Sequence, residues 1–324
     1  MVRVHAALLL VSLIYGYFYV TVKLLFKTIT PAELILLRFL LTAFLVTGID
    51  QFVLKNPPPQ RQDLPVICKL GLLGVFVVQI LVAAGVNLTT ASHSALIMAT
   101  IPIFTLLISL IKKQESFQPI KLAGVVTAFI GVVILLMFSG SPSAPLPPHY
   151  MIGDLIVLLN AFAFAWFLVG SREILSRYSS FSFMAYCYIV SAALFSVCYL
   201  GGEQILYHQF GLGFLQHLGW QTWLLILYVV VFASIGSYTL NNFALKRTSP
   251  TVVAIYIFLQ PMISAATGYY VLGEHFTVGM AIAGILTFIG LLLTTVTSPV
   301  HTPTISQPEP EPELVCSQEQ EKEY

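Results

Sequence analysis

Charged residues are scarce in this chain. Only 9% of its 324 residues are Asp, Glu, Lys or Arg, against about 25% in a typical soluble domain. Hydrophobic residues make up 57%, and the mean hydropathy is +0.88. This composition excludes a soluble protein and predicts an integral membrane protein with most of its length in the lipid bilayer. The formal net charge of +1 gives no sign of nucleic-acid binding.

Cysteine is also scarce, and its spacing indicates no metal chemistry. The four cysteines (Cys68, Cys187, Cys198 and Cys316) form no CxxC motif and no cluster with histidine. We therefore expect no metal site, no structural disulfide and no cofactor. The sequence also lacks a P-loop, an HExxH motif, a GxSxG motif and a Gly-rich dinucleotide turn. These absences argue against an ATP-driven pump, and the chain is not expected to be an enzyme.

Long apolar runs are abundant instead. A transmembrane helix needs about 20 predominantly apolar residues. Ten segments meet this requirement: 5–26, 33–54, 65–88, 92–111, 119–139, 151–172, 180–200, 221–245, 249–271 and 277–297. The sequence thus predicts an all-α integral membrane protein with ten transmembrane helices. Between the seventh and eighth spans, residues 201–220 fit either an interfacial helix or a plain outer loop.

Lys and Arg set the orientation of the spans, because they concentrate on the cytoplasmic side of membrane proteins. With a cytoplasmic N-terminus, the inside segments and adjoining helix ends hold Arg3, Lys55, Arg61, Lys69, Lys112, Lys113, Lys121, Arg172, Arg177, Lys246, Arg247 and Lys322. The outside holds only Lys23 and Lys27, and Arg38 lies within the second span. We expect a multi-pass protein of the cell (plasma or inner) membrane with both termini in the cytoplasm.

The second half of the chain repeats the first at a shift of 159 positions. Residues 102–131 align with residues 261–290 without a gap, so that Glu115 falls on Glu274. Five spans per half is an odd number, so the second half enters the membrane from the opposite side. An inverted repeat supports two related conformations, one open to each side, as alternating access requires.

The predicted domains follow from this repeat. The first five-helix repeat occupies residues 1–140 and the second occupies residues 151–297, with an outer linker at 141–150. Residues 298–324 contain six of the fourteen acidic residues and are rich in proline. This segment is predicted to be a disordered, acidic cytoplasmic tail.

Two prolines mark the candidate substrate site. Pro102 and Pro261 occupy matched positions near the middles of the fourth and ninth spans. A proline within a helix displaces the carbonyl four residues back, which here belongs to Met98 and to Ile257. Such a carbonyl is costly in lipid, so we expect both kinks to face a central cavity. Tolerance of proline by membrane helices is the competing interpretation.

Neutral polar and aromatic residues near mid-membrane complete this candidate substrate site. They are Tyr15, Tyr19, Gln79, Asn160, Trp166, Tyr238, Asn241, Tyr256 and Gln260. Each must find a hydrogen-bond partner away from water, either on another helix or on a substrate. As a set they suit amphipathic or aromatic small molecules.

Arg38 is the one basic residue well inside a predicted span. A charge within the membrane is a candidate functional group. Arg38 could extend to the outer membrane surface. Glu33 and Asp154 also lie near that face, so pairing with one of them is expected, with substrate binding as the alternative. Elsewhere, small residues in spans 5 and 10, such as Gly131 and Gly290, allow close packing within one protomer or a homodimer through these spans.

Short motifs in both halves resemble the drug/metabolite transporter superfamily, and within it the EamA-type ten-span transporters. The residues that carry the resemblance are Gly16, Lys23, Pro31, Arg38, Phe39, Pro102, Glu115, Gly124, Gly131, Gly153, Asp154, Trp166 and the run LQPMISAATGYYVLGE ending at Glu274. The resemblance implies a cavity surrounded by spans 1, 3, 4, 6, 8 and 9. Tyr15 stands where members usually have tryptophan, so the substrate is not transferred from the family.

The repeat and the resemblance together predict a secondary transporter. It is expected to export small metabolites, amino acids or drug-like compounds by alternating access. An importer or exchanger of phosphorylated or nucleotide-sugar metabolites is an alternative, which would need several cationic residues in the cavity. A membrane-embedded lipid-modifying enzyme is a further alternative, which would need a cluster of His, Asp or Cys at one membrane face.

Overall fold

The computed structural model describes residues 2–88, 97–139, 150–207, 213–260, 262–263 and 278–296, and all regular structure within these ranges is helical. The first half contains α1 (Val2–Leu25), α2 (Pro31–Gly48) with η1 (Ile49–Leu54), α3 (Leu64–Gly71) with η2 (Leu72–Val77) and α4 (Val78–Leu88), α6 (Ile101–Ile111) and α7 (Pro119–Ser139). The second half contains α8 (Tyr150–Arg177), α9 (Ser180–Tyr207), η3 (Gly213–His217), α10 (Trp220–Tyr228) with η4 (Val229–Gly236) and α11 (Ser237–Leu245), α12 (Pro250–Ile255) with η5 (Tyr256–Phe258), and α14 (Val278–Val296).

Each of the ten predicted spans contains one of these helical stretches, which confirms the all-α fold class. By length and hydropathy, five stretches are able to cross a membrane, and four shorter helices are apolar. Parts of the fourth and ninth spans, most of the predicted linker and the predicted acidic tail lie outside the described residues.

Side-chain hydrogen bonds cap the first turns of α2 and α12, each of which follows a short loop. At α2, the Thr30 side chain accepts a hydrogen bond from the Glu33 N–H, and Glu33 Oε2 accepts one from the Thr30 N–H at 2.6 Å. At α12, the Ser249 side chain accepts from the Val252 N–H at 3.4 Å. In both helices a proline follows the capping residue, where its missing N–H costs nothing and its fixed φ suits the helix.

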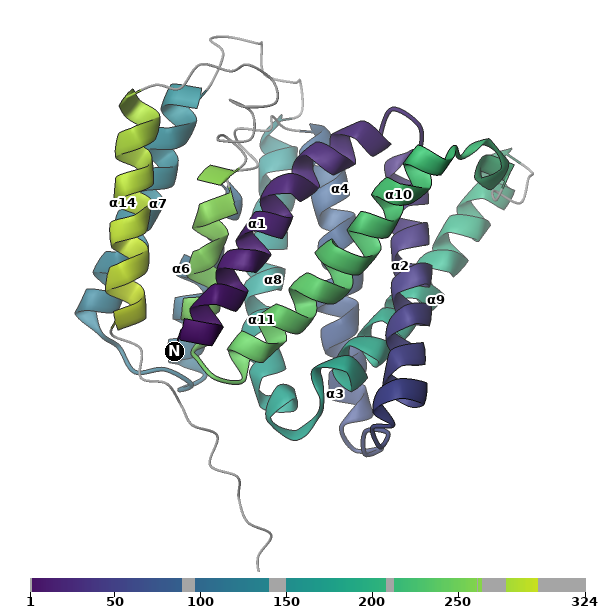
Figure 1. Cartoon of the computed structure of the whole chain (residues 1–324), viewed down its shortest axis with the longest axis horizontal. Helices are drawn as coiled ribbons and strands as arrows, with labels where there is room; N and C mark the ends of the chain where they lie inside the picture. Colours follow the sequence, from purple (N-terminus) through teal and green to yellow (C-terminus); the bar gives the residue numbers. More distant parts are fainter. Residues whose placement is uncertain are drawn as a thin grey trace, which may run out of the picture.

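Matched helices of the two halves pack against each other. The pairs α7 with α14, α2 with α9, and α6 with α12 each join one span to its own counterpart. The contact of α4 with α8 is equivalent to the contact of α11 with α1, because α4 matches α11 and α8 matches α1 in the two halves. In Figure 1, the α7–α14 pair lies at one side and the α2–α9 pair at the other, with the remaining helices between them. This arrangement fits a two-fold axis between the halves.

The contact between α7 and α14 shows directly that the repeat is inverted. A Cβ atom added at Gly131 would lie 2.8 Å from the Ala283 carbonyl oxygen, and one added at Gly124 would lie 2.8 Å from that of Gly290. Residue numbers therefore rise along α7 as they fall along α14, so matched helices are antiparallel. The small residues serve packing within one protomer. A homodimer through the outer faces of these helices stays a prediction.

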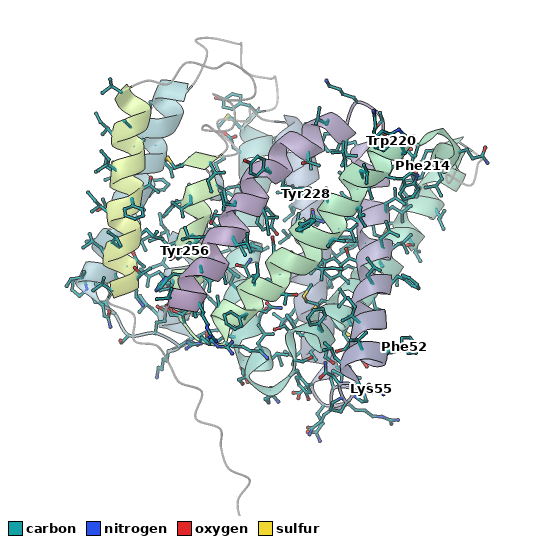
Figure 2. The ribbon with its side chains drawn as sticks, in the orientation of Figure 1. Phe52, Lys55, Phe214, Trp220, Tyr228 and Tyr256 are labelled. Atoms are coloured by element: carbon teal, nitrogen blue, oxygen red, sulfur yellow. The ribbon has the colours of Figure 1, made fainter. Side chains whose placement is uncertain are left out.

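Aromatic and basic side chains mark the two ends of the helices. Figure 2 shows Phe214 and Trp220 near one end, and Phe52 with Lys55 near the opposite end. Trp220 and Phe52 are 71% and 79% exposed. Aromatic residues favour the two membrane–water interfaces, so these positions fit the boundaries of the bilayer. We call the end that carries Lys55 and the loops at 112–118, 178–179 and 246–249 the basic end.

Candidate functional site

The site begins with a widened helix in each half. The span formed by α3 and α4 contains the π-helical segment η2, and the matched span formed by α10 and α11 contains η4. Such segments are rare and frequently occur at functional sites. Gln79 is the second residue after η2, and Tyr238 is the second residue after η4. The two candidate residues thus occupy equivalent positions in the two halves.

Arg38 lies at the centre of a polar cluster between the halves. Its side chain is buried, Nε donates to Ser234 Oγ at 2.7 Å, and Nη1 donates to Gln79 Oε1 at 3.3 Å. The guanidinium also lies over the Phe18 ring, 5.2 Å from its centroid. Tyr15 interacts with Arg38 from α1. Four segments, α1, α2, α4 and η4, therefore bring residues of both halves to one guanidinium.

Buried aromatic rings form a wall beside this cluster. The Tyr188 ring on α9 meets Phe39 at a centroid distance of 6.1 Å and Tyr238 at 5.9 Å. Tyr238 in turn contacts the Phe167 ring at 6.2 Å. Both tyrosines interact electrostatically with Arg38. We call Arg38, Gln79, Ser234, Tyr15, Tyr188 and Tyr238 the Arg38 cluster.

The expected charge pairing of Arg38 is replaced by neutral partners. Glu33 lies five residues before Arg38, which turns it to another face of α2, and its carboxylate caps the start of that helix. Asp154 is the fifth residue of α8 and is not among the described contacts of Arg38. Among the described residues, the ion pairs instead lie at the basic end.

Pro102 produces a break in its span. Residues 99 and 100 form a turn, and α6 begins at Ile101, so Pro102 sits in the first turn of a new helix. A proline is tolerated there because its missing N–H has no helical acceptor. The predicted kink is therefore a helix start. Beside it, Asn160 is fully buried, and its Nδ2 donates to the Met98 sulfur at 3.1 Å.

The matched region of the second half is also irregular. Residues 256–258, which correspond to residues 97–99, form the 3-10 segment η5. Tyr256 fixes α1 here, because its hydroxyl is hydrogen-bonded to His5 Nδ1 at 2.7 Å and its carbonyl accepts from Ser12 Oγ at 3.0 Å. Gln260 lies in the following turn, and Pro261 lies outside the described residues.

The remaining candidates lie away from the Arg38 cluster or are less completely described. Trp166 lies under Lys112, whose Nζ is 4.5 Å from the ring centroid, so it belongs near the basic end. Asn241 is half-buried on α11. Tyr19 lies on α1, and its side chain is not among those described. The sequence did not single out Ser234, Tyr188 or Phe18, since a serine and two aromatic residues within apolar spans carry no distinguishing pattern.

Glu115 joins the two halves at the basic end. Its carboxylate is 3% exposed, pairs with Lys121 Nζ at 2.6 Å, and accepts from the Thr251 N–H at 3.1 Å and hydroxyl at 2.8 Å. It therefore caps α12 of the other half. The preceding Gln114 accepts from Arg172 Nη1 on α8 at 3.2 Å. We call these contacts the Glu115 latch.

A second group of contacts closes the loops of the basic end. Asp63 accepts from Arg177 Nη1 at 2.8 and 2.9 Å and from the Tyr178 hydroxyl at 2.6 Å. The Asp63 hydrogen bond raises the pKa of Tyr178. Lys246 Nζ donates to the Tyr178 carbonyl at 2.7 Å, and burial together with neighbouring Arg247 lowers the pKa of Lys246.

Replacing Asp63 with asparagine is expected to lower the free energy of unfolding by about 0.5–1 kcal/mol, because Arg177 is half exposed and the pair is screened. Thermal unfolding of the purified protein in detergent measures the change. Glu173→Gln is the control: this carboxylate is 76% exposed and lies 3.7 Å from the same Arg177. Equal melting temperatures for the two variants would contradict the expectation that Asp63 stabilises the fold more than Glu173 does.

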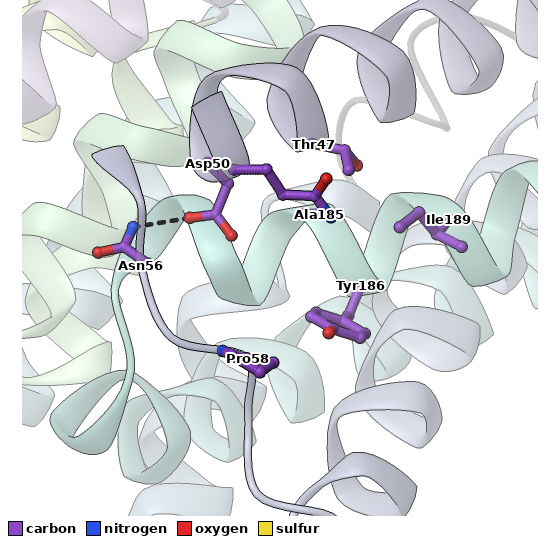
Figure 3. A pocket seen from close by; sticks show the side chains of 8 residues that line it. Thr47, Asp50, Asn56, Pro58, Ala185, Tyr186 and Ile189 are labelled. Carbon is purple, nitrogen blue, oxygen red and sulfur yellow. Dashed lines mark hydrogen bonds between the residues drawn. The ribbon is translucent and has the colours of Figure 1, made fainter. Parts of the chain in front are cut away.

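A pocket with a volume of about 250 Å³ lies at the basic end, between η1 and α9. Figure 3 shows Asp50 and Asn56 in it, joined by a 2.7 Å hydrogen bond, with the Tyr186 ring opposite. Asp50 follows Arg38 by twelve residues, or about 18 Å along a helix. The pocket is therefore separate from the Arg38 cluster. Among the described residues, no three His, Cys, Asp or Glu side chains are placed to hold a metal ion.

Comparison with known proteins identifies the family. The model of the EamA-like transporter family matches residues 3–137 and again residues 151–296. An uncharacterized transporter from Archaeoglobus fulgidus is 26% identical over 295 residues, covering 90% of this chain and 97% of its own length. A WAT1-related protein from Arabidopsis thaliana is 22% identical over 280 residues, covering 77% of this chain and 68% of its own.

A solved crystal structure shares the fold. It has a TM-score of 0.69 and 20% sequence identity, and the match covers 90% of this chain and 97% of the other. The family model covers both membrane halves, and curated relatives along most of the chain are named transporters. The chain is therefore a membrane transporter that belongs to the EamA-like transporter family.

Proposed function

We propose that the protein is a secondary transporter that exports small metabolites, amino acids or drug-like compounds by alternating access. One observation carries this proposal: the Arg38 cluster is assembled from α1, α2 and α4 of one half and from α9, η4 and α11 of the other. A substrate held between two inverted halves is exposed to one side or the other when the halves rock against each other.

The proposed membrane is the cell (plasma or inner) membrane, with the basic end in the cytoplasm. The loops that meet there carry Lys55, Lys112, Lys113, Lys246 and Arg247, in keeping with the excess of positive charge on cytoplasmic sides. The N-terminus also lies at this end, because His5 contacts Tyr256, which directly follows the short helix α12. The acidic tail is proposed to be cytoplasmic as well.

The alternatives have less support among the described residues. A phosphorylated or nucleotide-sugar substrate carries at least two negative charges, whereas the described membrane interior places one cation, Arg38, between the halves. A lipid-modifying enzyme requires a nucleophile, acid–base or metal cluster at a membrane face. Two relatives from Archaeoglobus fulgidus, which match most of the chain, are named as uncharacterized transporters.

Everted vesicles from cells that express the protein provide the test. We expect energised vesicles to accumulate at least one compound from a panel of radiolabelled amino acids, organic acids and cationic dyes. Vesicles without the protein are the control. The proposal is overturned if no panel compound accumulates and the purified protein, reconstituted into liposomes, converts lipid substrates.

A further inference from the structure

The Arg38 guanidinium carries a positive charge that no described residue neutralises. Its side chain is 4% exposed, and its hydrogen-bond acceptors, Ser234 Oγ and Gln79 Oε1, are both uncharged. The described ion pairs involve Lys121 and Arg177, both near the basic end. Arg38 thus differs from the buried Glu115 and Lys121 side chains, which neutralise each other.

A buried cation without a counter-ion is costly. The penalty for removing one ion from water is several kcal/mol even after relaxation, and neutral hydrogen bonds offset only part of it. Arginine cannot avoid this penalty by losing its proton. The cost is recovered when an anion arrives, and the planar guanidinium matches a carboxylate in two parallel hydrogen bonds. A buried arginine with neutral neighbours therefore has the character of an anion receptor.

We propose that Arg38 binds the carboxylate of the transported substrate, and that the substrate class is small monocarboxylates with an apolar or aromatic body. The inference rests on the proposed function. The single charge of Arg38 matches a single carboxylate. Tyr188 and Tyr238 interact with Arg38, and the Tyr188 ring contacts those of Tyr238 and Phe39, which gives the body of the ligand an aromatic surface.

Binding of a matched pair of probes tests the proposal without requiring transport. The probes are 3-phenylpropanoate and its neutral amide, 3-phenylpropanamide, added at pH 7.4 to purified protein and measured by calorimetry and by thermal stabilisation. We expect the wild-type protein to bind the carboxylate and to bind the amide about 10- to 100-fold more weakly, the value of one charge-assisted contact. Phenyl phosphate, a dianion, is expected to bind more weakly than the carboxylate.

Three variants locate the contact. Arg38→Gln is expected to reduce carboxylate affinity about 10- to 100-fold and to leave the amide unchanged. Arg38→Lys keeps the charge but cannot form two parallel hydrogen bonds with a carboxylate. Its carboxylate affinity should therefore fall between those of the wild-type protein and Arg38→Gln. Arg247→Gln is the control, because Arg247 lies over Phe243 outside the cluster. If Arg38→Gln does not fold, the comparison of the acid with the amide in the wild-type protein still tests whether the protein recognises a carboxylate.

The outcomes separate this inference from the proposed function. Equal binding of acid and amide by the wild-type protein overturns the carboxylate proposal, even if vesicles accumulate other compounds. An unchanged carboxylate affinity in folded Arg38→Gln overturns the assignment to Arg38. Carboxylate binding that depends on Arg38, without accumulation of any compound in vesicles, supports the inference and counts against the proposed export.

Discussion

Replacing Glu115 with alanine is expected to lower the free energy of unfolding by about 3–5 kcal/mol, the cost of leaving one member of a buried ion pair alone. Glu115 and Lys121 are each 3% exposed, so the Lys121 ammonium would stay buried without its counter-ion. The change also removes the acceptor for the Thr251 N–H and hydroxyl. Thermal unfolding in detergent measures the effect.

Two further variants separate charge from capping. Glu115→Gln keeps an oxygen for Thr251 but leaves the Lys121 charge, so it should remain strongly destabilised. Combining Glu115→Gln with Lys121→Met should recover most of the loss, because the uncompensated charge is gone. Glu173→Gln, which removes a 76% exposed carboxylate, is the matched control. The ion-pair explanation is wrong if the double variant is less stable than Glu115→Gln.

The Glu115 latch also bears on the proposed transport cycle. It ties the loop after α6 in one half to α8 and α12 in the other. Opening the basic end would require these contacts to break. We therefore expect Glu115→Gln to speed the labelling of a cysteine introduced at buried Ser109, in a background without the native cysteines. Labelling at the wild-type rate would show that the latch does not hold this end closed.

The sequence predicted the features that depend on local composition and on the repeat. Apolar runs of about 20 residues placed the spans, and the aligned segments around Pro102 and Pro261 indicated two related halves. The odd number of spans per half then required inversion, which the antiparallel packing of Gly131 against Ala283 displays. These conclusions required no knowledge of which side chains meet.

The composition of the site was harder to predict, because its contacts join residues far apart in the chain. Arg38 was identified from its charge, but its partner Ser234 is 196 positions away and is one of many polar residues in apolar spans. The widening of η2 and η4 leaves no mark in hydropathy. Trp166 and Tyr256 were expected in the cavity, yet Lys112 and His5 engage them near the basic end.

The packing of α7 against α14 gives the last prediction: Gly290→Ala is expected to be destabilising although alanine favours helices more than glycine. A Cβ at Gly290 would overlap the Ala128 N–H and the Gly124 carbonyl, which are backbone atoms and move only if the two helices separate. Overpacking of this kind costs about 1–3 kcal/mol, and Gly290→Val should cost more because its branched side chain is larger.

Gly284 supplies the matched control on the same helix. A Cβ added there would meet nothing within 4 Å, so Gly284→Ala should gain up to about 1 kcal/mol from helix propensity alone. The two alanine variants have the same composition, and their melting temperatures in detergent are therefore expected to move in opposite directions. Equal shifts would show that α7 and α14 do not pack through these glycines. Opposite shifts would tie the stability of the fold to the packing of α7 against α14.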